Sequence, residues 1–245
     1  MRNAWLIAKR ELGAYFIQPL GYIFAVIALF FGGYFFMLGM AQGMQFQGSA
    51  PADLGNVFGI FNFLGLFFIP ALTMRLLSEE RQTGTIEVLM TLPIRDGEVV
   101  LGKFLAGTIF YTIIVAFTLV FALILSRYGN PDIPVMLTGY LGVILFGALM
   151  IAAGVFASAI SDSQITAWII GFAIALILFI IDFAVPLFPN LPGWASTFFT
   201  ELSSNAHYTT MFQGLIEVKD IIYFLGLIAI FLFAATRIME SRRWR

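Results

Sequence analysis

Six long apolar runs constrain the fold of this chain more than any other feature. A helix needs about 20 apolar residues to cross the roughly 30 Å hydrocarbon core of a bilayer. Runs of that order cover approximately residues 19–40, 57–74, 104–125, 137–160, 165–185 and 221–236. The last run is the shortest, so it needs flanking residues or a thinner bilayer to span. Because backbone polar groups in lipid must bond inside the chain, the sequence predicts an all-α integral membrane protein with six transmembrane helices.

Composition excludes several other classes of protein. With 60% hydrophobic and 11% charged residues, the chain is too apolar for an ordinary soluble domain. The net charge of -1 and the lack of a large basic cluster give no indication of nucleic-acid binding. The chain has no cysteine, which excludes disulfides and thiolate chemistry. We therefore expect a single transmembrane domain over residues 19–245, preceded by a separate segment over residues 1–18.

The cations in the loops predict the orientation. If both termini lie in the cytoplasm, only Arg127 and Lys219 remain outside. The cations on the inside are then Arg2, Lys9, Arg10, Arg75, Arg81, Arg95, Lys103, Arg237, Arg242, Arg243 and Arg245. The positive-inside rule strongly favours this arrangement.

Residues 1–18 have the pattern of an amphipathic helix. Apolar and aromatic residues recur there at steps of three and four, namely Trp5, Ala8, Leu12, Tyr15 and Phe16. Trp and Tyr favour the headgroup level, and Lys9 and Arg10 can reach anionic lipid. The pattern predicts a helix in the membrane interface, in contact with lipid. A plain N-terminal extension of the first span is the alternative.

The external segment of residues 186–220 differs from the other loops. It begins with three prolines and continues with many aromatic residues and the single histidine. It is too apolar for a freely solvated loop and too interrupted for another span, so a re-entrant or interfacial element fits best. Its notable side chains are Trp194, His207 and Phe212. We interpret His207 as a hydrogen-bonding residue rather than a catalytic one or a ligand.

The loop of residues 75–103 is the one sizeable segment on the cytoplasmic side, and it predicts a short helix. Thr85 can serve as the N-cap, and Glu87 lies in the first turn, where the helix dipole favours an acid. The residues Ile86, Leu89, Met90 and Pro93 share one side. Such a helix is too short to be stable alone. It either docks in a groove of a partner or of this protein, or packs on lipid headgroups.

Several kinds of chemistry are missing from the sequence. No P-loop motif is present, so the chain has no P-loop site for ATP. One histidine, no cysteine and no His-Glu-x-x-His make a histidine-based metal site improbable, and no Gly-x-Ser-x-Gly elbow is found. The sequence therefore indicates a chain that is not an enzyme and holds no cofactor or metal.

A few polar residues within the predicted spans are candidates for a pathway. Asp182 is the ionisable residue that we place inside the membrane, near the outer end of the fifth span, and a structural role is favoured over a proton relay. Asn62 and Thr73 in the second span either line a pathway or bond between helices. The fourth span is dense in small residues, which permit close approach of helices within one bundle.

Two stretches of the sequence resemble a known family. Residues 78–94, SEERQTGTIEVLMTLPI, followed by VLGKF at 100–104, are similar to the signature loop of ABC type 2 exporter permeases. Residues 202–224 and the closing ESRRW at 240–244 resemble the branch of gliding-motility permeases and of permeases for copper-site maturation of nitrous-oxide reductase. The resemblance covers essentially the whole chain, although the second match indicates a branch and not a cargo.

The resemblance implies roles for several segments. Residues 85–92, preceded by Gly84, would be the coupling helix that sits in a cleft of a separate cytoplasmic ATPase, which would bind ATP and Mg²⁺. Glu79, Glu80 and Arg81 would form a polar junction between that helix and the second span. The helix within residues 1–18, with Trp5, Lys9, Arg10 and Glu11, would be the connecting helix. Residues 186–212 would cap the pathway on the outside.

The resemblance also implies an assembly and a location. Two permease copies, most simply a homodimer, would act with two ATPase subunits in a bacterial inner membrane. The resemblance leaves room for an auxiliary extracytoplasmic protein as a further partner. The expected function is that of the permease subunit of an ATP-driven exporter or extruder. The alternative is a membrane module that transports nothing and transmits ATPase motion to an external partner. The substrate is not predicted.

Overall fold

A computed structural model describes residues 2–45, 54–84, 95–128, 131–188 and 192–242. Its regular elements are all helical. They are α1 (Arg2–Ile17), α2 (Pro19–Gln45), α3 (Gly55–Thr73), α4 (Arg75–Gln82), α6 (Asp96–Phe117), α7 (Leu119–Tyr128), α8 (Ile133–Ile160), α9 (Gln164–Ile180), a 3-10 turn η1 (Ile181–Phe183), α10 (Ala184–Leu187), α11 (Gly193–Leu202), α12 (Ser204–Phe212) and α13 (Val218–Arg242). The predicted all-α class is confirmed.

Six helical segments of the described chain are long and apolar enough to cross a membrane, as predicted. They are Pro19–Gln42, Gly55–Gln82, Asp96–Tyr128, Ile133–Ile160, Gln164–Leu187 and Val218–Ser241. Three of them extend beyond the predicted bounds by residues that include charged side chains. The second continues past residue 74 into α4, the third begins at Asp96 instead of 104, and the sixth begins at Val218 instead of 221. The sixth segment is 24 residues long, so it spans without help from a thinner bilayer.

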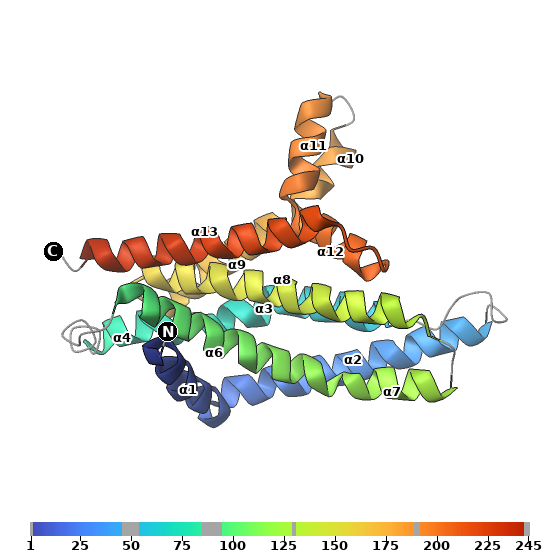
Figure 1. Cartoon of the computed structure of the whole chain (residues 1–245), viewed down its shortest axis with the longest axis horizontal. Coiled ribbons are helices and arrows are strands. Elements are labelled where there is room, and N and C mark those ends of the chain that lie inside the picture. The colour runs from blue at the N-terminus through green and yellow to red at the C-terminus, as the bar shows by residue number, and fades with distance from the viewer. Residues whose placement is uncertain (1, 46–53, 85–94, 129–130, 189–191, 243–245) are drawn as a thin grey trace.

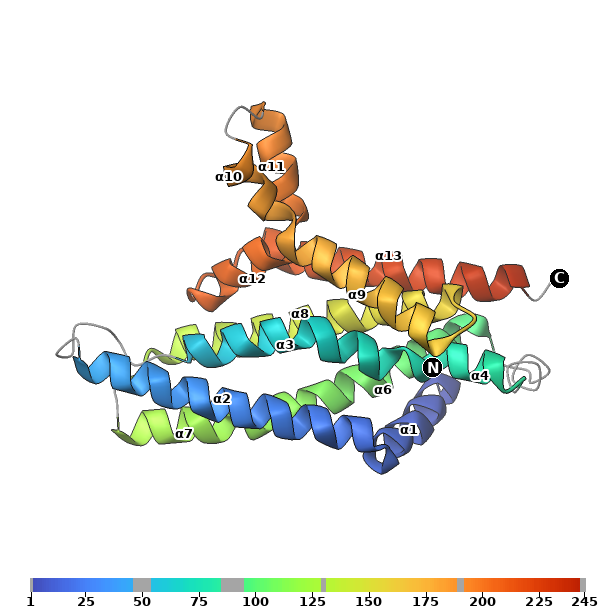
Figure 2. The same cartoon turned by 180° about the vertical axis from the view of Figure 1, so that it is seen from behind.

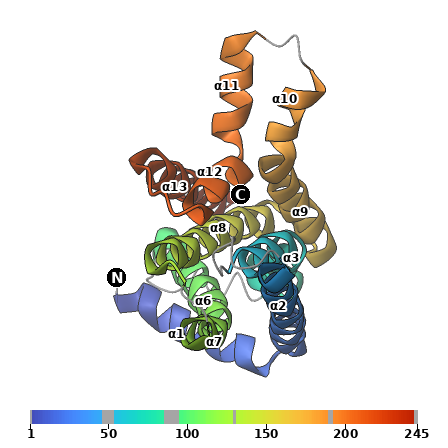
Figure 3. The ribbon, with the colours of Figure 1, turned by 90° about the vertical axis from the view of Figure 1, so that its right-hand side faces the viewer.

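The helices form an elongated bundle around α8 (Figures 1 and 3). Of the most apolar window of α8, 78% is buried, against 17–33% for the windows that contain α2, α6, α9 and α13. It packs against α3, α6, α9, α12 and α13. We call the end of the bundle that carries both chain termini the terminal end, and the other the distal end (Figure 1). The α4 helix lies at the terminal end, and α1 lies there against α6 (Figure 2).

Close approach to α8 depends on its glycines. A Cβ atom added to Gly147 would overlap the ring of Tyr111 on α6, and one added to Gly154 would overlap the side chain of Thr73 on α3. The small residues of this span therefore serve packing inside one chain, which is the reading that the sequence favoured. They let bulky side chains of two neighbouring helices reach the backbone of α8.

The segment between the fifth and sixth spans consists of two different parts. α10 and α11 form an arm that projects sideways from the bundle (Figures 1–3). α12 instead packs on α8, α9 and α13, and it buries His207, Tyr208 and Met211. The segment therefore combines a projecting arm with a helix that belongs to the bundle.

Replacing Gly147 by alanine should lower the stability of the solubilised protein. The new methyl group would displace the Tyr111 ring, and overpacking of this kind costs about 1–3 kcal/mol. Gly226→Ala on α13 is the matched control, because nothing lies within 4 Å of its added Cβ. Alanine is also the better helix former there, by up to about 1 kcal/mol. In thermal unfolding in detergent, the melting temperature of Gly147→Ala should lie well below that of the control. Equal melting temperatures would contradict the packing described.

Candidate functional site

The three polar residues near the end of α4 bond to three different parts of the chain. Glu79 pairs with Arg75 of the same helix through two contacts of 2.7 and 2.9 Å. Glu80 pairs with Lys103 on α6 at 2.8 Å. Arg81 donates to the backbone at the end of α8. These contacts fix the position of α4 at the terminal end. The chain then continues into residues 85–94, which lie outside the described part.

Lys103 forms the centre of a cluster of buried charge. Its ammonium group is 2.8 Å from Glu80 Oε1 on α4 and 3.2 Å from Glu11 Oε1 on α1, and its side chain is 2% exposed. Arg10 closes the cluster from the rim, at 3.0 Å from Glu11 and 3.5 Å from Glu80. We call these four residues the charge cluster. A buried ammonium ion is tolerated only when it is paired, so the cluster requires α1, α4 and α6 to stay together.

The local sequence explains why α1 and α6 meet at this point. Asp96 and Glu98 lie in the first turn of α6, where acids are favoured by the helix dipole. Asn3 of α1 donates to Glu98 at 3.0 Å. A Cβ on Gly102 would lie 2.8–2.9 Å from Ala4 O and the side chain of Ile7, so a glycine is needed for α1 to pack this closely. The helix start and this glycine together place Lys103 against α1.

Arg81 joins α4 to the C-terminal end of α8. Its guanidinium donates to the carbonyl oxygens of Ala159 and, at 2.9 Å, of Ser161, and it lies 3.5 Å from Asp162 Oδ1. These carbonyls belong to the C-terminal end of α8, where the helix itself leaves acceptors unused. The positive charge also suits the negative end of the α8 dipole. Arg81 therefore caps α8 from α4.

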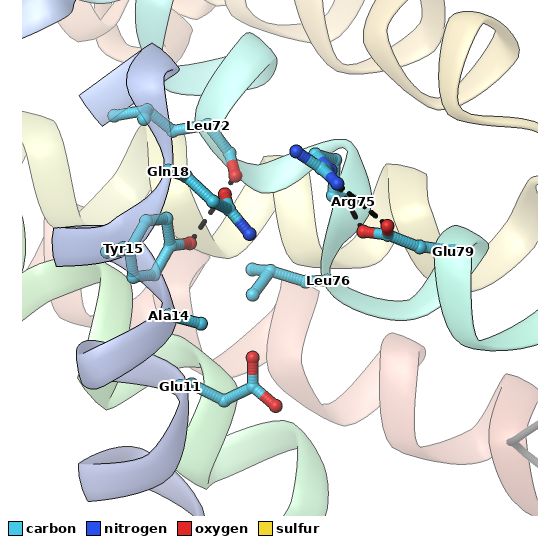
Figure 4. A pocket seen from close by; sticks show the side chains of 8 residues that line it. All are labelled: Glu11, Ala14, Tyr15, Gln18, Leu72, Arg75, Leu76 and Glu79. Carbon is cyan, nitrogen blue, oxygen red and sulfur yellow. Dashed lines mark hydrogen bonds and ion pairs between the residues drawn. The ribbon is translucent and has the colours of Figure 1, made fainter. Parts of the chain in front are cut away.

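A polar cleft of about 320 Å³ lies between α1 and α4 beside the charge cluster. Its charged lining comes from Arg10, Glu11, Arg75, Glu79, Glu80 and Lys103. Figure 4 shows a neighbouring pocket that shares part of this lining. There Tyr15 Oη donates to Leu72 O at 3.4 Å. Burial raises the pKa of Tyr15 above its ordinary value, and the charge of Glu11 raises it further. The Tyr15 hydroxyl therefore stays a neutral donor that ties α1 to the end of α3.

The apolar residues of the predicted connecting helix are partly buried and partly exposed. Ala8 and Tyr15 are buried against the bundle, whereas the side chains of Trp5 and Phe16 are 57% and 42% exposed. Lys9 is exposed, and Glu11 belongs to the charge cluster. The sequence predicted contact of this helix with lipid, and one edge of the helix, with Ala8 and Tyr15, packs on the bundle. The other edge is free for lipid or a partner.

The predicted coupling helix falls outside the described residues. This applies to Thr85, Ile86, Glu87, Leu89, Met90 and Pro93. The described chain reaches Gly84, whose φ of 71° lies in the left-handed region that favours glycine. Gly84 thus ends the turn after α4, as glycine commonly does behind a helix.

The three residues predicted for a pathway lie at separate places. Thr73 is fully buried against α8, and its hydroxyl donates to the carbonyls of Ile69 and Pro70 at 2.9 and 3.2 Å. Asn62 is 4% exposed within α3. Asp182 follows α9 and accepts hydrogen bonds from Ser203 at 2.9 Å and from Asn205 at 3.4 Å. This geometry agrees with the structural role favoured for Asp182.

The candidate residues of the distal element also have separate surroundings. His207 Nδ1 is 2.6 Å from Asp220 Oδ1 on α13, its Nε2 is 3.0 Å from Glu201 O, and its ring stacks on Tyr223. Trp194 on the arm is 77% exposed, and Phe212 packs edge-on against Phe58. His207 is thus a hydrogen-bonding residue, although it is buried at a helix contact and not in a loop.

Sequence reasoning missed three buried polar residues, namely Lys103, Ser158 and Asp220. Lys103 and Asp220 were assigned to loops because the predicted third and sixth spans began after them. The acidic residues Asp96 and Glu98 were the available signal for an earlier helix start. Ser158 was counted among the small residues of the fourth span. Its hydrogen bonds cross to another helix, which periodicity does not reveal.

The site consists of paired charges and helix caps, and it offers no reacting group. In the described ranges, no three His, Cys, Asp or Glu side chains are grouped to hold a metal ion. Six helices long and apolar enough to span a membrane make this a multi-pass membrane protein, and at one end of the bundle α4 is bonded to α6 and α8.

Comparison with known proteins identifies the family. The sequence model of the ABC-2 family transporter proteins matches residues 7–243, nearly the whole chain, and the chain belongs to this family. It is accordingly the membrane permease component of an ABC system and not its ATPase, and the family implies a partner ATPase subunit. A search of curated proteins finds no match.

Removing the Lys103 ammonium group should destabilise the protein. Lys103→Met leaves Glu11 and Glu80 without their central partner, and breaking a buried pair costs several kcal/mol. The two carboxylates are 14% and 17% exposed, so we expect about 2–3 kcal/mol and a drop of several degrees in melting temperature.

Two controls accompany this substitution. Arg10→Met removes a cation that is 68% exposed and should cost less than about 1 kcal/mol. Adding Glu80→Gln to Lys103→Met should recover part of the loss. Both are measured by thermal unfolding in detergent. A Lys103→Met protein as stable as the unchanged chain would show that the cluster does not hold the helices together.

Proposed function

We propose that this chain is the permease subunit of an ATP-driven exporter or extruder, with its terminal end in the cytoplasm. The observation that supports the proposal is the set of contacts that fix α4 to its neighbouring helices. Within a family of transporter proteins, this helix leads into residues 85–94 and is bonded through Glu80 and Arg81 to α1, α6 and α8. A push on residues 85–94 would therefore reach several helices at once. The loop cations support the orientation.

The coupling element of this proposal is a helix over residues 85–92. Ile86, Leu89 and Met90 would enter a cleft of the ATPase, which binds ATP and Mg²⁺, while Glu79, Glu80 and Arg81 hold the base of the helix. The α1 helix would lie beside it as the connecting helix, with the exposed Trp5 in the interface. Closure of the ATPase on ATP would then move the junction as a unit.

Two copies of the chain, most simply identical, would enclose the pathway in a bacterial inner membrane. The distal segment with Trp194, His207 and Phe212 would form its outer cover. The similarity of residues 202–224 and 240–244 to the gliding-motility and copper-maturation permeases favours that branch of the family.

A second function is supported by the arm of α10 and α11. It stands clear of the bundle and exposes large apolar side chains, among them Leu187, Trp194 and Phe198, at 72%, 77% and 57%. Such a surface suits an auxiliary extracytoplasmic protein, in which case the chain would transmit ATPase motion to that protein and transport nothing. Deleting the arm would abolish recruitment of such a protein in this alternative, whereas an exporter would keep its substrate-dependent ATP hydrolysis.

Replacing Ile86, Leu89 and Met90 together by alanine should uncouple ATP hydrolysis by the ATPase from the permease. Burial of each apolar side chain stabilises docking by about 1.5–3 kcal/mol, so we expect binding to weaken by about a hundredfold or more. Permease-dependent stimulation of ATP hydrolysis, measured with the purified ATPase and permease in lipid nanodiscs, should fall to the basal rate. Leu215→Ala, a residue 57% exposed beyond α12, is the control and should leave stimulation unchanged. Normal binding and stimulation by the triple variant would refute the coupling assignment.

A further inference from the structure

The second span is interrupted at Met74, where α3 ends and α4 begins. Pro70 lies inside α3 and removes one bond of its last turns. The hydroxyl of Thr73 bonds back to the carbonyls of Ile69 and Pro70. Met74 offers no side-chain cap for the amides that begin α4. The start of α4 thus needs acceptors from elsewhere.

Those acceptors come from α8. The hydroxyl oxygen of Ser158 accepts from the backbone amides of Leu77 at 2.9 Å and Ser78 at 3.0 Å, and it donates to Met74 O at 3.0 Å. In an uninterrupted helix, these two amides donate to the carbonyls of residues 73 and 74. Ser158 is fully buried. One side chain of α8 therefore enters the hydrogen-bond ladder of the second span and caps α4 in trans.

The cap is reciprocal. While Ser158 of α8 caps the first turn of α4, Arg81 near the end of α4 caps the last carbonyls of α8 at Ala159 and Ser161. The two helices therefore satisfy each other's unused backbone groups, over one to two turns of each. The connection from α4 to α3, by contrast, crosses the break at Met74.

We propose that α4 and the C-terminal end of α8 form one rigid unit, and that α8 is the span which follows motion of α4. Ser158 and Arg81 are its positioning residues. The inference rests on the proposed function, because it requires the ATPase to move α4. Since α8 is the most buried span and contacts α3, α6, α9, α12 and α13, its displacement reaches helices throughout the bundle.

Amide hydrogen exchange on the complex with its ATPase tests this inference. Without nucleotide, Ser158→Ala should raise exchange at Leu77 and Ser78 roughly fivefold, the equivalent of one lost hydrogen bond. Ser126→Ala is the matched control, because its hydroxyl bonds only within α7, to Leu123 O at 2.8 Å. It should leave α4 unchanged. Arg81→Gln is a second variant that breaks the other half of the cap.

The decisive readout is the response to a non-hydrolysable ATP analogue with Mg²⁺. In the unchanged chain, exchange should change together in α4 and in residues 157–161. In Ser158→Ala, the change in α4 should persist, while that in residues 157–161 falls by more than half; a purely stabilising hydroxyl would not alter this response. A change in α4 with none in α8, or an unaltered joint change in Ser158→Ala, overturns the inference alone. If nucleotide changes neither segment, the proposed coupling fails, and the inference fails with it.

Discussion

The pairing of one buried ammonium group organises the terminal end of this protein. Lys103 lies on α6 with almost no exposed surface, and its two carboxylate partners come from α1 and α4. Separating a buried charge from its partners is strongly destabilising. The contacts of Lys103 therefore hold α1, α4 and α6 together. The charge cluster therefore fixes the position of α4 shortly before residues 85–94 begin.

The charge cluster adjoins a bundle whose central helix is α8. Glycines at Gly147 and Gly154 bring α6 and α3 directly onto its backbone. Ser158 and Arg81 connect its end to α4. An interior this closely packed transmits a displacement instead of absorbing it. In this ABC-2 family permease, α4 is therefore connected to α1 and α6 through the charge cluster and to α8 through the mutual caps.

Hydrophobicity predicted the fold class and the six spans, because the length and polarity of a spanning helix are set by the bilayer. It could not predict where helices begin in the interface, where water and caps decide. Lys103 and Asp220 were missed for that reason. The pattern of α1 predicted contact with lipid and did not reveal that Ala8 and Tyr15 pack on the bundle, because its neighbours were unknown. The family resemblance predicted that Glu79, Glu80 and Arg81 form a polar junction with the coupling helix, which lies outside the described residues. Their individual partners, above all the α8 end and Lys103, depend on tertiary packing that spacing along one segment does not encode.

The proposed function requires a separate ATPase that binds this membrane domain at its terminal end. Its most direct test is affinity purification of the tagged chain from its own membranes in mild detergent, with crosslinking to prevent losses and stoichiometric mass spectrometry of what accompanies it. An ABC ATPase subunit should be recovered in a one-to-one ratio, crosslinked to the segment between Gly84 and Arg95. Recovery of the chain without any ATPase, with crosslinking in place, would contradict the proposed function.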